Sequence, residues 1–164
     1  MKQKEVLNLV EAINLVSGVG SERFKWAVYR TKRKLEKEQQ EAMTYIGELK
    51  PEKLKTLQKE QTELYQNCKN QDERLKAYQN WDKKEELEQA LRDFVNSEKY
   101  QEYLNMENTE FKPYQIDLKA SDLKGIPLDN ENVFWVLEMI GNNAENAIEE
   151  ILKEREQEGK PKTK

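Results

Sequence analysis

Hydrophobic residues recur at intervals of three and four along most of this chain, and this spacing is the feature that most constrains its fold. Residues three and four apart lie on one face of an α-helix. Between residues 21 and 49 the repeat gives one stripe, which consists of Phe24, Val28, Thr31, Leu35, Ala42, Tyr45 and Leu49. The spacing therefore predicts a mainly α-helical protein in which each helix buries a narrow face.

The stripes have to be narrow because the chain is poor in hydrophobic residues. Only 36% of its 164 residues are hydrophobic, 37% are charged, and the mean hydropathy is -1.07. A chain of this composition cannot fill a thick globular core. We expect a single helical domain over residues 1–156 that is elongated or completes its core on a partner. A frayed basic tail should follow over residues 157–164.

Two neighbouring stripes predict a long antiparallel helical hairpin over about residues 21–70. Ser21 follows two glycines and suits the N-cap of the first helix. Pro51 suits the first turn of the second helix. The stripe of this second helix is Leu54, Leu57, Leu64 and Cys68. Two long helices with one seam each are typical of such a hairpin.

Shorter helices and one extended segment should make up the rest of the chain. Residues 3–17 carry a stripe of their own, and further helices should begin near Asp82, Ser97, Asp129 or Asn130, and Asn142. Around NCKNQDERLKAYQNW the pattern loosens, which favours a turn or a short extended piece. The stretch FKPYQIDLKASDLKGIP alternates in polarity and contains two prolines. It predicts an edge strand or extended arm, and thus at most a minor two-stranded element.

Several classes of function are disfavoured by the residues that the chain lacks. It has no histidine and only one cysteine, Cys68, so the commonest general base and zinc ligand are missing. The segment Glu110-Phe-Lys112 has the spacing of some metal-dependent nucleases, but Pro113 interrupts it and Asp117 follows it. We expect no enzymatic activity, no metal, no cofactor and no small-molecule substrate. No run approaches ~18 consecutive apolar residues, so we expect a cytoplasmic protein without a signal peptide or membrane contact.

The segment SERFKWAVYRTKRKLEKE is the clearest candidate for a binding surface. Residues 22–37 contain seven basic and two acidic residues, whereas residues 98–164 contain nine basic and fifteen acidic residues. A helical wheel places Trp26, Tyr29, Arg30, Arg33 and Lys37 opposite the apolar stripe. Such a face could bind another protein or the acidic part of its own chain, or it could simply be solvated. It could also bind nucleic acid through phosphate contacts and base stacking. The residues for that alternative are Arg23, Lys25, Trp26, Tyr29, Arg30, Arg33 and Lys37.

The segment VFWVLEMI, residues 133–140, is a second candidate. Its hydrophobic residues cover nearly all sides of a helix. Val133, Val136, Leu137 and Ile140 can face a core, which leaves Trp135 and Met139 on another side. Either another element covers these two side chains, or they contact a partner or a second copy of the chain.

The order of these segments resembles that of a diffuse group of small, uncharacterised helical proteins of tailed bacteriophages. The segments that carry the resemblance are RFKWAVYRTKRKLEKE, the long charged middle and YQIDLKASDLKGIPLDNENVFWVLEMI. The resemblance implies a viral accessory or assembly-related protein and transfers no site residues. We therefore expect a phage-encoded protein of the host cytoplasm or the virion. It should bind another protein, as a virion or assembly component or as an inhibitor of a host factor, with contacts from Trp26, Trp135 and Met139.

Overall fold

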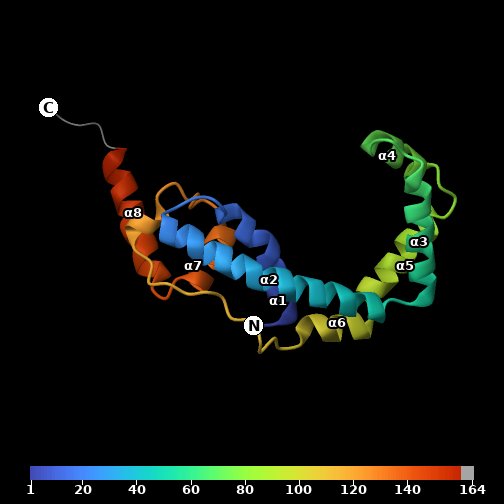
Figure 1. Ribbon diagram of the computed structural model, residues 1–164, viewed down its shortest axis with the longest axis horizontal. Helices are drawn as coiled ribbons and strands as arrows, with labels where there is room; N and C mark the ends of the chain where they lie inside the picture. Colours follow the sequence, from blue (N-terminus) through green and yellow to red (C-terminus); the bar gives the residue numbers. More distant parts are fainter. Residues whose placement is uncertain (160–164) are drawn as a thin grey trace. The chain divides into compact units, whose positions relative to one another are not determined.

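A computed structural model describes residues 1–159 and confirms a mainly α-helical protein (Figure 1). The N-terminal helices are α1 (Gln3–Ala12), the 3-10 helix η1 (Ile13–Val16) and α2 (Glu22–Leu49). The middle of the chain forms α3 (Glu52–Gln66), α4 (Gln71–Gln79), α5 (Lys84–Val95) and α6 (Glu98–Asn105). The last elements are the 3-10 helix η2 (Ala120–Leu123), α7 (Glu131–Ile140) and α8 (Ala144–Glu158). The frayed tail predicted over residues 157–164 begins too early, because α8 continues to Glu158, and the part from residue 160 onward lies outside the described residues.

The segment between α6 and η2 contains neither helix nor strand. Two isolated β-bridges connect this segment to the rest of unit 1: Glu107 pairs with Lys2, and Ile116 pairs with Gly141. No strand is present within residues 1–159, so the predicted edge strand is replaced by an irregular arm. None of the helices in this range is both long and apolar enough to cross a membrane.

The described residues form two compact units. Unit 1 comprises Met1–Glu41 and the described residues from Glu107 onward, and unit 2 comprises Ala42–Met106. Helix α2 begins in unit 1 and ends in unit 2. The two hydrophobic clusters share no residue, so the domain predicted over residues 1–156 contains two separate cores. Whether these units unfold as one domain stays a prediction.

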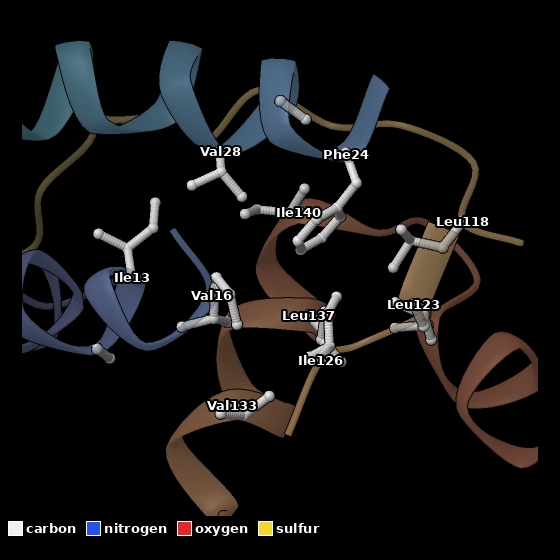
Figure 2. Packing of buried hydrophobic residues seen from close by; sticks show 14 of the residues in the cluster. Ile13, Val16, Phe24, Val28, Leu118, Leu123, Ile126, Val133, Leu137 and Ile140 are labelled. Atoms are coloured by element: carbon white, nitrogen blue, oxygen red, sulfur yellow. The ribbon is translucent and has the colours of Figure 1, made fainter. Parts of the chain in front are cut away.

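The core of unit 1 lies between α2, η1 and α7 (Figure 2). Phe24 and Val28 point from α2 toward Leu137 and Ile140 of α7, and all four side chains are almost completely buried. The side chain of Ser21 caps the N-terminus of α2, because its Oγ accepts a hydrogen bond from the backbone N–H of Phe24 at 3.1 Å. The predicted stripe and N-cap of this helix are therefore confirmed in unit 1.

Unit 2 does not confirm the predicted antiparallel hairpin over residues 21–70. Helix α3 packs against α4 and α5, where its Leu54 and Leu57 cluster with Leu87 and Phe94. The buried stripe of α2 from Phe24 to Leu35 is occupied by the core of unit 1. That part of α2 is therefore not available as a partner for α3.

The prediction of a turn or extended piece around NCKNQDERLKAYQNW is wrong, because this stretch contains helix α4. The helix buries none of its residues, so it leaves no apolar periodicity in the sequence. Its start is fixed by local hydrogen bonds. The side chain of Asn70 accepts from the backbone N–H of Glu73 at 2.9 Å, and the Glu73 carboxylate accepts from the backbone N–H of Lys69 at 2.7 Å.

Candidate protein-binding surface

An aromatic pair stands on the side of α2 that faces away from the core of unit 1. Trp26 and Tyr29 are 52% and 53% exposed. Their rings stack, with centroids 5.6 Å apart and an interplanar angle of 25°. Two aromatic rings in van der Waals contact restrict each other's rotamers, so the pair presents a fixed apolar surface to solvent.

Arg30 extends this pair toward the irregular arm. Its guanidinium lies 5.7 Å from the ring centroid of Trp26 and 5.7 Å from that of Tyr114. Tyr114 is held there because its backbone N–H donates to the Oγ1 of the fully buried Thr31 at 3.0 Å. We call Trp26, Tyr29, Arg30 and Tyr114 the aromatic–arginine cluster. No carboxylate pairs with Arg30 among the residues that the structure describes.

The other cations predicted on this face are largely neutralised by neighbours on the same helix. Three exposed ion pairs join Lys25 to Glu22 at 2.9 Å, Arg33 to Glu36 at 3.4 Å and Lys37 to Glu41 at 3.7 Å. Exposed pairs of this kind contribute little to stability. They do reduce the positive charge that the face offers to a ligand, so the surface is less cationic than the sequence suggests.

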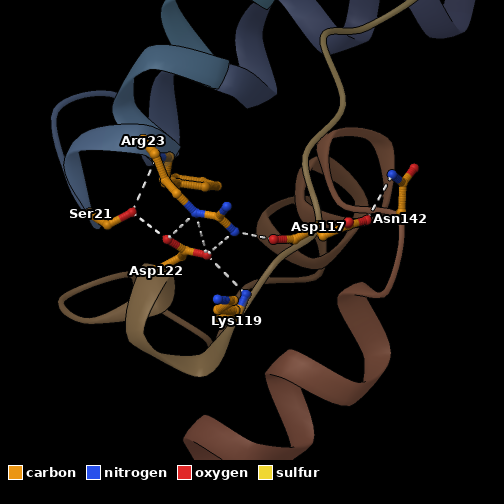
Figure 3. Close-up of polar contacts among 7 residues, drawn as sticks. Ser21, Arg23, Asp117, Lys119, Asp122 and Asn142 are labelled. Atoms are coloured by element: carbon orange, nitrogen blue, oxygen red, sulfur yellow. Dashed lines mark hydrogen bonds and ion pairs between the residues drawn. The ribbon is translucent and has the colours of Figure 1, made fainter.

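Arg23 belongs to a different site, in which it clamps Asp122 (Figure 3). Its Nε and Nη2 lie 3.0 Å and 2.9 Å from the two carboxylate oxygens, and Nη2 also donates to the carbonyl of Asp117. The Oγ of Ser21 and the backbone N–H of Lys119 donate to the same carboxylate at 2.5 Å and 2.9 Å. The guanidinium of Arg23 therefore ties α2 to η2 within unit 1, and its charge is paired with the Asp122 carboxylate.

These hydrogen bonds determine the charge state of Asp122, which is only 3% exposed. Burial alone raises the pKa of a carboxyl group. Here the hydrogen bonds from Arg23, Ser21 and the Lys119 backbone outweigh burial and lower the pKa of Asp122 to about 2. The carboxylate is thus ionised at neutral pH and fully paired, which is the arrangement of a structural clamp.

Trp135 and Met139, predicted to contact a partner, are both half-buried against the core of unit 1. The four residues predicted to face that core, Val133, Val136, Leu137 and Ile140, are all buried. Trp135 also lines a groove of about 510 Å³, whereas Met139 does not. The other lining residues are Glu5, Asn8, Glu11, Ala12, Leu15 and Asn132.

The sequence did not indicate Tyr114 of the cluster or any groove residue other than Trp135. Tyr114 joins the cluster only because the arm crosses α2, and Leu15, which is 42% exposed, had no signal beyond being hydrophobic. No group of three or more Cys, Asp or Glu residues in the described part of the chain could hold a metal ion. Cys68 is half-buried and its Sγ lies 3.7 Å from the carbonyl of Leu64.

Comparison with known proteins returned no matching family model, no matching curated protein and no matching solved structure. The function of the chain therefore has to be inferred from its own surfaces.

Proposed function

We propose that this protein is non-enzymatic and acts by binding another protein through the aromatic–arginine cluster. The observation that carries the proposal is the pair of stacked, half-exposed rings of Trp26 and Tyr29 beside Arg30. Trp, Tyr and Arg are the residues most enriched at the energetic centres of protein interfaces. A large apolar surface that stays exposed in the free protein gains free energy when a partner covers it.

The cluster is also ordered before any partner binds. Trp26 and Tyr29 stand on one helix and stack on each other, and Tyr114 is fixed by the buried Thr31. Side chains that are already restricted lose less conformational entropy in a complex. This order favours a specific partner over nonspecific adhesion.

The charges of the cluster indicate the chemistry of the partner. Arg30 has aromatic neighbours but no carboxylate partner within residues 1–159. A partner that places a carboxylate over Arg30 and an apolar side chain against Trp26 would satisfy both groups. The partner surface should therefore be acidic and partly apolar.

Nucleic-acid binding is the second candidate, and the exposed Trp26 ring favours it because a base can stack on such a surface. The remaining candidates for phosphate contacts are Lys25, Arg30, Arg33 and Lys37. Three of these four already pair with Glu residues, which is why a protein partner is the preferred proposal.

The biological setting forms part of the same proposal. The resemblance to small tailed-phage proteins supports a phage-encoded accessory protein, either a virion or assembly component or an inhibitor of a host factor. Such a protein would act in the host cytoplasm or on the virion.

The proposal is tested by capture of partners with tagged full-length protein from native or infected cells, with and without nuclease. A stoichiometric protein should survive nuclease and should be lost from the Trp26→Ala and Arg30→Ala variants. Met43→Ala is the matched control, because Met43 lies on the same helix and is 66% exposed but lies outside the cluster. Nucleic acid in the eluate, with partners lost after nuclease, would favour the second candidate. Partners that the cluster variants retain would overturn the proposal.

A further inference from the structure

The groove at Trp135 has a mixed lining of apolar and polar side chains. The apolar part consists of Trp135 on α7, together with Ala12 and Leu15 at the end of α1 and in η1. Trp135 is half-buried, and Leu15 leaves 42% of its surface in water. With a volume of about 510 Å³, the groove has room for large side chains of another molecule.

The polar part of the groove lining is acidic. Glu5 and Glu11 line it together with the amides of Asn8 and Asn132, and no Lys or Arg does so. One oxygen of Glu5 accepts from the backbone N–H of Lys2 at 2.6 Å. Glu11 is exposed and forms no ion pair with any described residue. A ligand for this groove should therefore combine an apolar or aromatic group with a positive charge.

The aromatic–arginine cluster on α2 has this combination. Trp26 and Tyr29 are exposed rings, and Arg30 is a cation without a carboxylate partner in the described residues. The neighbouring cations of this face are paired with Glu residues of the same helix, so Arg30 supplies the positive charge that the cluster offers. Each surface thus lacks the group that the other presents.

The cluster and the groove share no residue. The cluster is built from α2 and the arm, whereas the groove is built from α1, η1 and α7. One molecule therefore presents two separate surfaces. An interface between two different surfaces of identical chains is heterologous, and it builds rings or open chains of molecules.

From this complementarity we infer that a partner of the cluster is a second copy of this chain, whose Trp135 groove receives the cluster. The inference rests on the proposed function, because it names the partner of the same surface. Trp26 enters the groove against Trp135 and Leu15, and Arg30 lies near Glu11. Each molecule then offers its own groove to the next, so association continues beyond a dimer.

Sedimentation of the full-length protein over a hundredfold range of concentration, at low and high salt, tests the inference. The mean mass should rise beyond that of a dimer at low salt and fall at high salt, because salt screens the charges. Glu11→Lys, which reverses the charge at the position proposed to lie near Arg30, should weaken association at least tenfold. The double variant Trp26→Ala/Arg30→Ala should do the same. The matched control is Glu154→Lys, the same charge change at an exposed position of α8 outside both surfaces, and it should associate like the wild type.

Mixing the Glu11→Lys protein with the Trp26→Ala/Arg30→Ala protein is the most direct test. The Glu11→Lys protein keeps an intact cluster, and the Trp26→Ala/Arg30→Ala protein keeps an intact groove. Each should be monomeric alone, and the mixture should form a one-to-one dimer and nothing larger. Circular dichroism should first show that both variants are as helical as the wild type.

A wild type that stays monomeric at low salt would overturn the inference, as would association that Glu11→Lys leaves unchanged or a mixture without a dimer. These failures differ from a failure of the proposed function. If the chain is monomeric and a captured protein is lost only from the Trp26→Ala and Arg30→Ala variants, the cluster binds a different partner. If the cluster variants change neither self-association nor capture, both proposals fail.

Discussion

Unit 1 buries 22 hydrophobic residues in one cluster, whereas the cluster of unit 2 has only four, Leu54, Leu57, Leu87 and Phe94. Unit 1 draws its core from both ends of the chain, while unit 2 is one continuous segment. The rest of the unit 2 core is supplied by half-buried residues such as Tyr78, Trp81 and Tyr100. The few hydrophobic residues of this chain are therefore concentrated in one unit instead of being spread evenly.

This concentration has a consequence for stability. Burial of apolar surface is the main favourable term in folding, at about 25 cal/mol per Å². Unit 2 has less of it, and its polar contacts include the hydrogen bond of 3.1 Å from the Tyr78 hydroxyl to Glu88. We expect unit 2 to unfold at a lower urea concentration than unit 1.

The largest effects should come from two matched substitutions, Leu137→Ala in unit 1 and Leu87→Ala in unit 2. The two side chains are 0% and 1% exposed, so each substitution leaves a similar cavity. Each should lower the free energy of unfolding of its own unit by about 2–5 kcal/mol. Urea unfolding followed by hydrogen exchange of individual amides separates the two units.

The comparison would fail if Leu87→Ala and Leu137→Ala shifted the same single transition by the same amount. That result would show that the two cores unfold together, as the predicted single domain would. Leu75→Ala is a suitable control, because this leucine is 54% exposed on α4 and should change neither transition.

An intermediate effect is expected for Asp122→Asn, which removes the charge from the clamp in unit 1. The pKa of Asp122 is about 2 in the folded protein and 3.8 in a model compound. A pKa that is lowered by folding stabilises the protein above its unfolded value, and the contribution disappears as pH falls through the folded value. We expect a loss of about 2 kcal/mol near neutral pH, which should shrink between about pH 5 and pH 2.

Urea unfolding of the wild type and of Asp122→Asn at a series of pH values measures this difference directly. The subtraction is essential because Asp122 is only one of the 32 acidic residues of the chain. Only the transition of unit 1 should respond. A difference that is independent of pH would show that the variant acts by disturbing packing instead of by removing charge.

The smallest effect should come from Lys83→Ala in unit 2. Its Nζ lies 2.6 Å from a carboxylate oxygen of Glu60, and this pair links the N-cap residue of α5 to α3. Both side chains are about one-third exposed or more, so solvent screens the attraction. The urea midpoint of unit 2 should fall slightly, by much less than for Leu87→Ala.

Lys53→Ala is the control for this substitution, because its pair with Glu86 is longer, at 3.4 Å, and more exposed. It should have no measurable effect. If Lys83→Ala lowered the urea midpoint of unit 2 as much as Leu87→Ala, polar contacts would dominate the stability of unit 2. The size of the two hydrophobic cores would then not explain a difference in stability between the units.

The sequence was sufficient where local chemistry decides the structure. The spacing from Phe24 to Leu35 predicted the buried face of α2, and Ser97 begins a helix as expected. Of the alternatives Asp129 and Asn130, the structure has Asn130 as the N-cap, and the helices expected at Asp82 and Asn142 have their N-caps one residue later. Helix α4 was missed because it buries no residue and depends on caps at Asn70 and Glu73. The expected hairpin was not confirmed because periodicity identifies a buried face but not its partner.

The same limit applies to the binding surfaces. The exposure of Trp26 and Tyr29 on one face followed from the helical wheel. The pairing of Arg23 with Asp122 could not be predicted, because Asp122 lies 99 residues further along the chain. Tyr114 likewise reaches Arg30 only through the tertiary structure.

The split of unit 1 between the two ends of the chain also determines the order in which the protein can fold during synthesis. A ribosome adds about 5–20 residues per second. The apolar face of α2 leaves it early, but Leu118 and Leu137, which belong to the same core, follow only after the whole of unit 2. For several seconds the nascent chain can complete its smaller core but not its larger one. The unit that we expect to be less stable is therefore the first that can form, and the face around Phe24 has to remain soluble, or be shielded by a chaperone, until the C-terminal helices emerge.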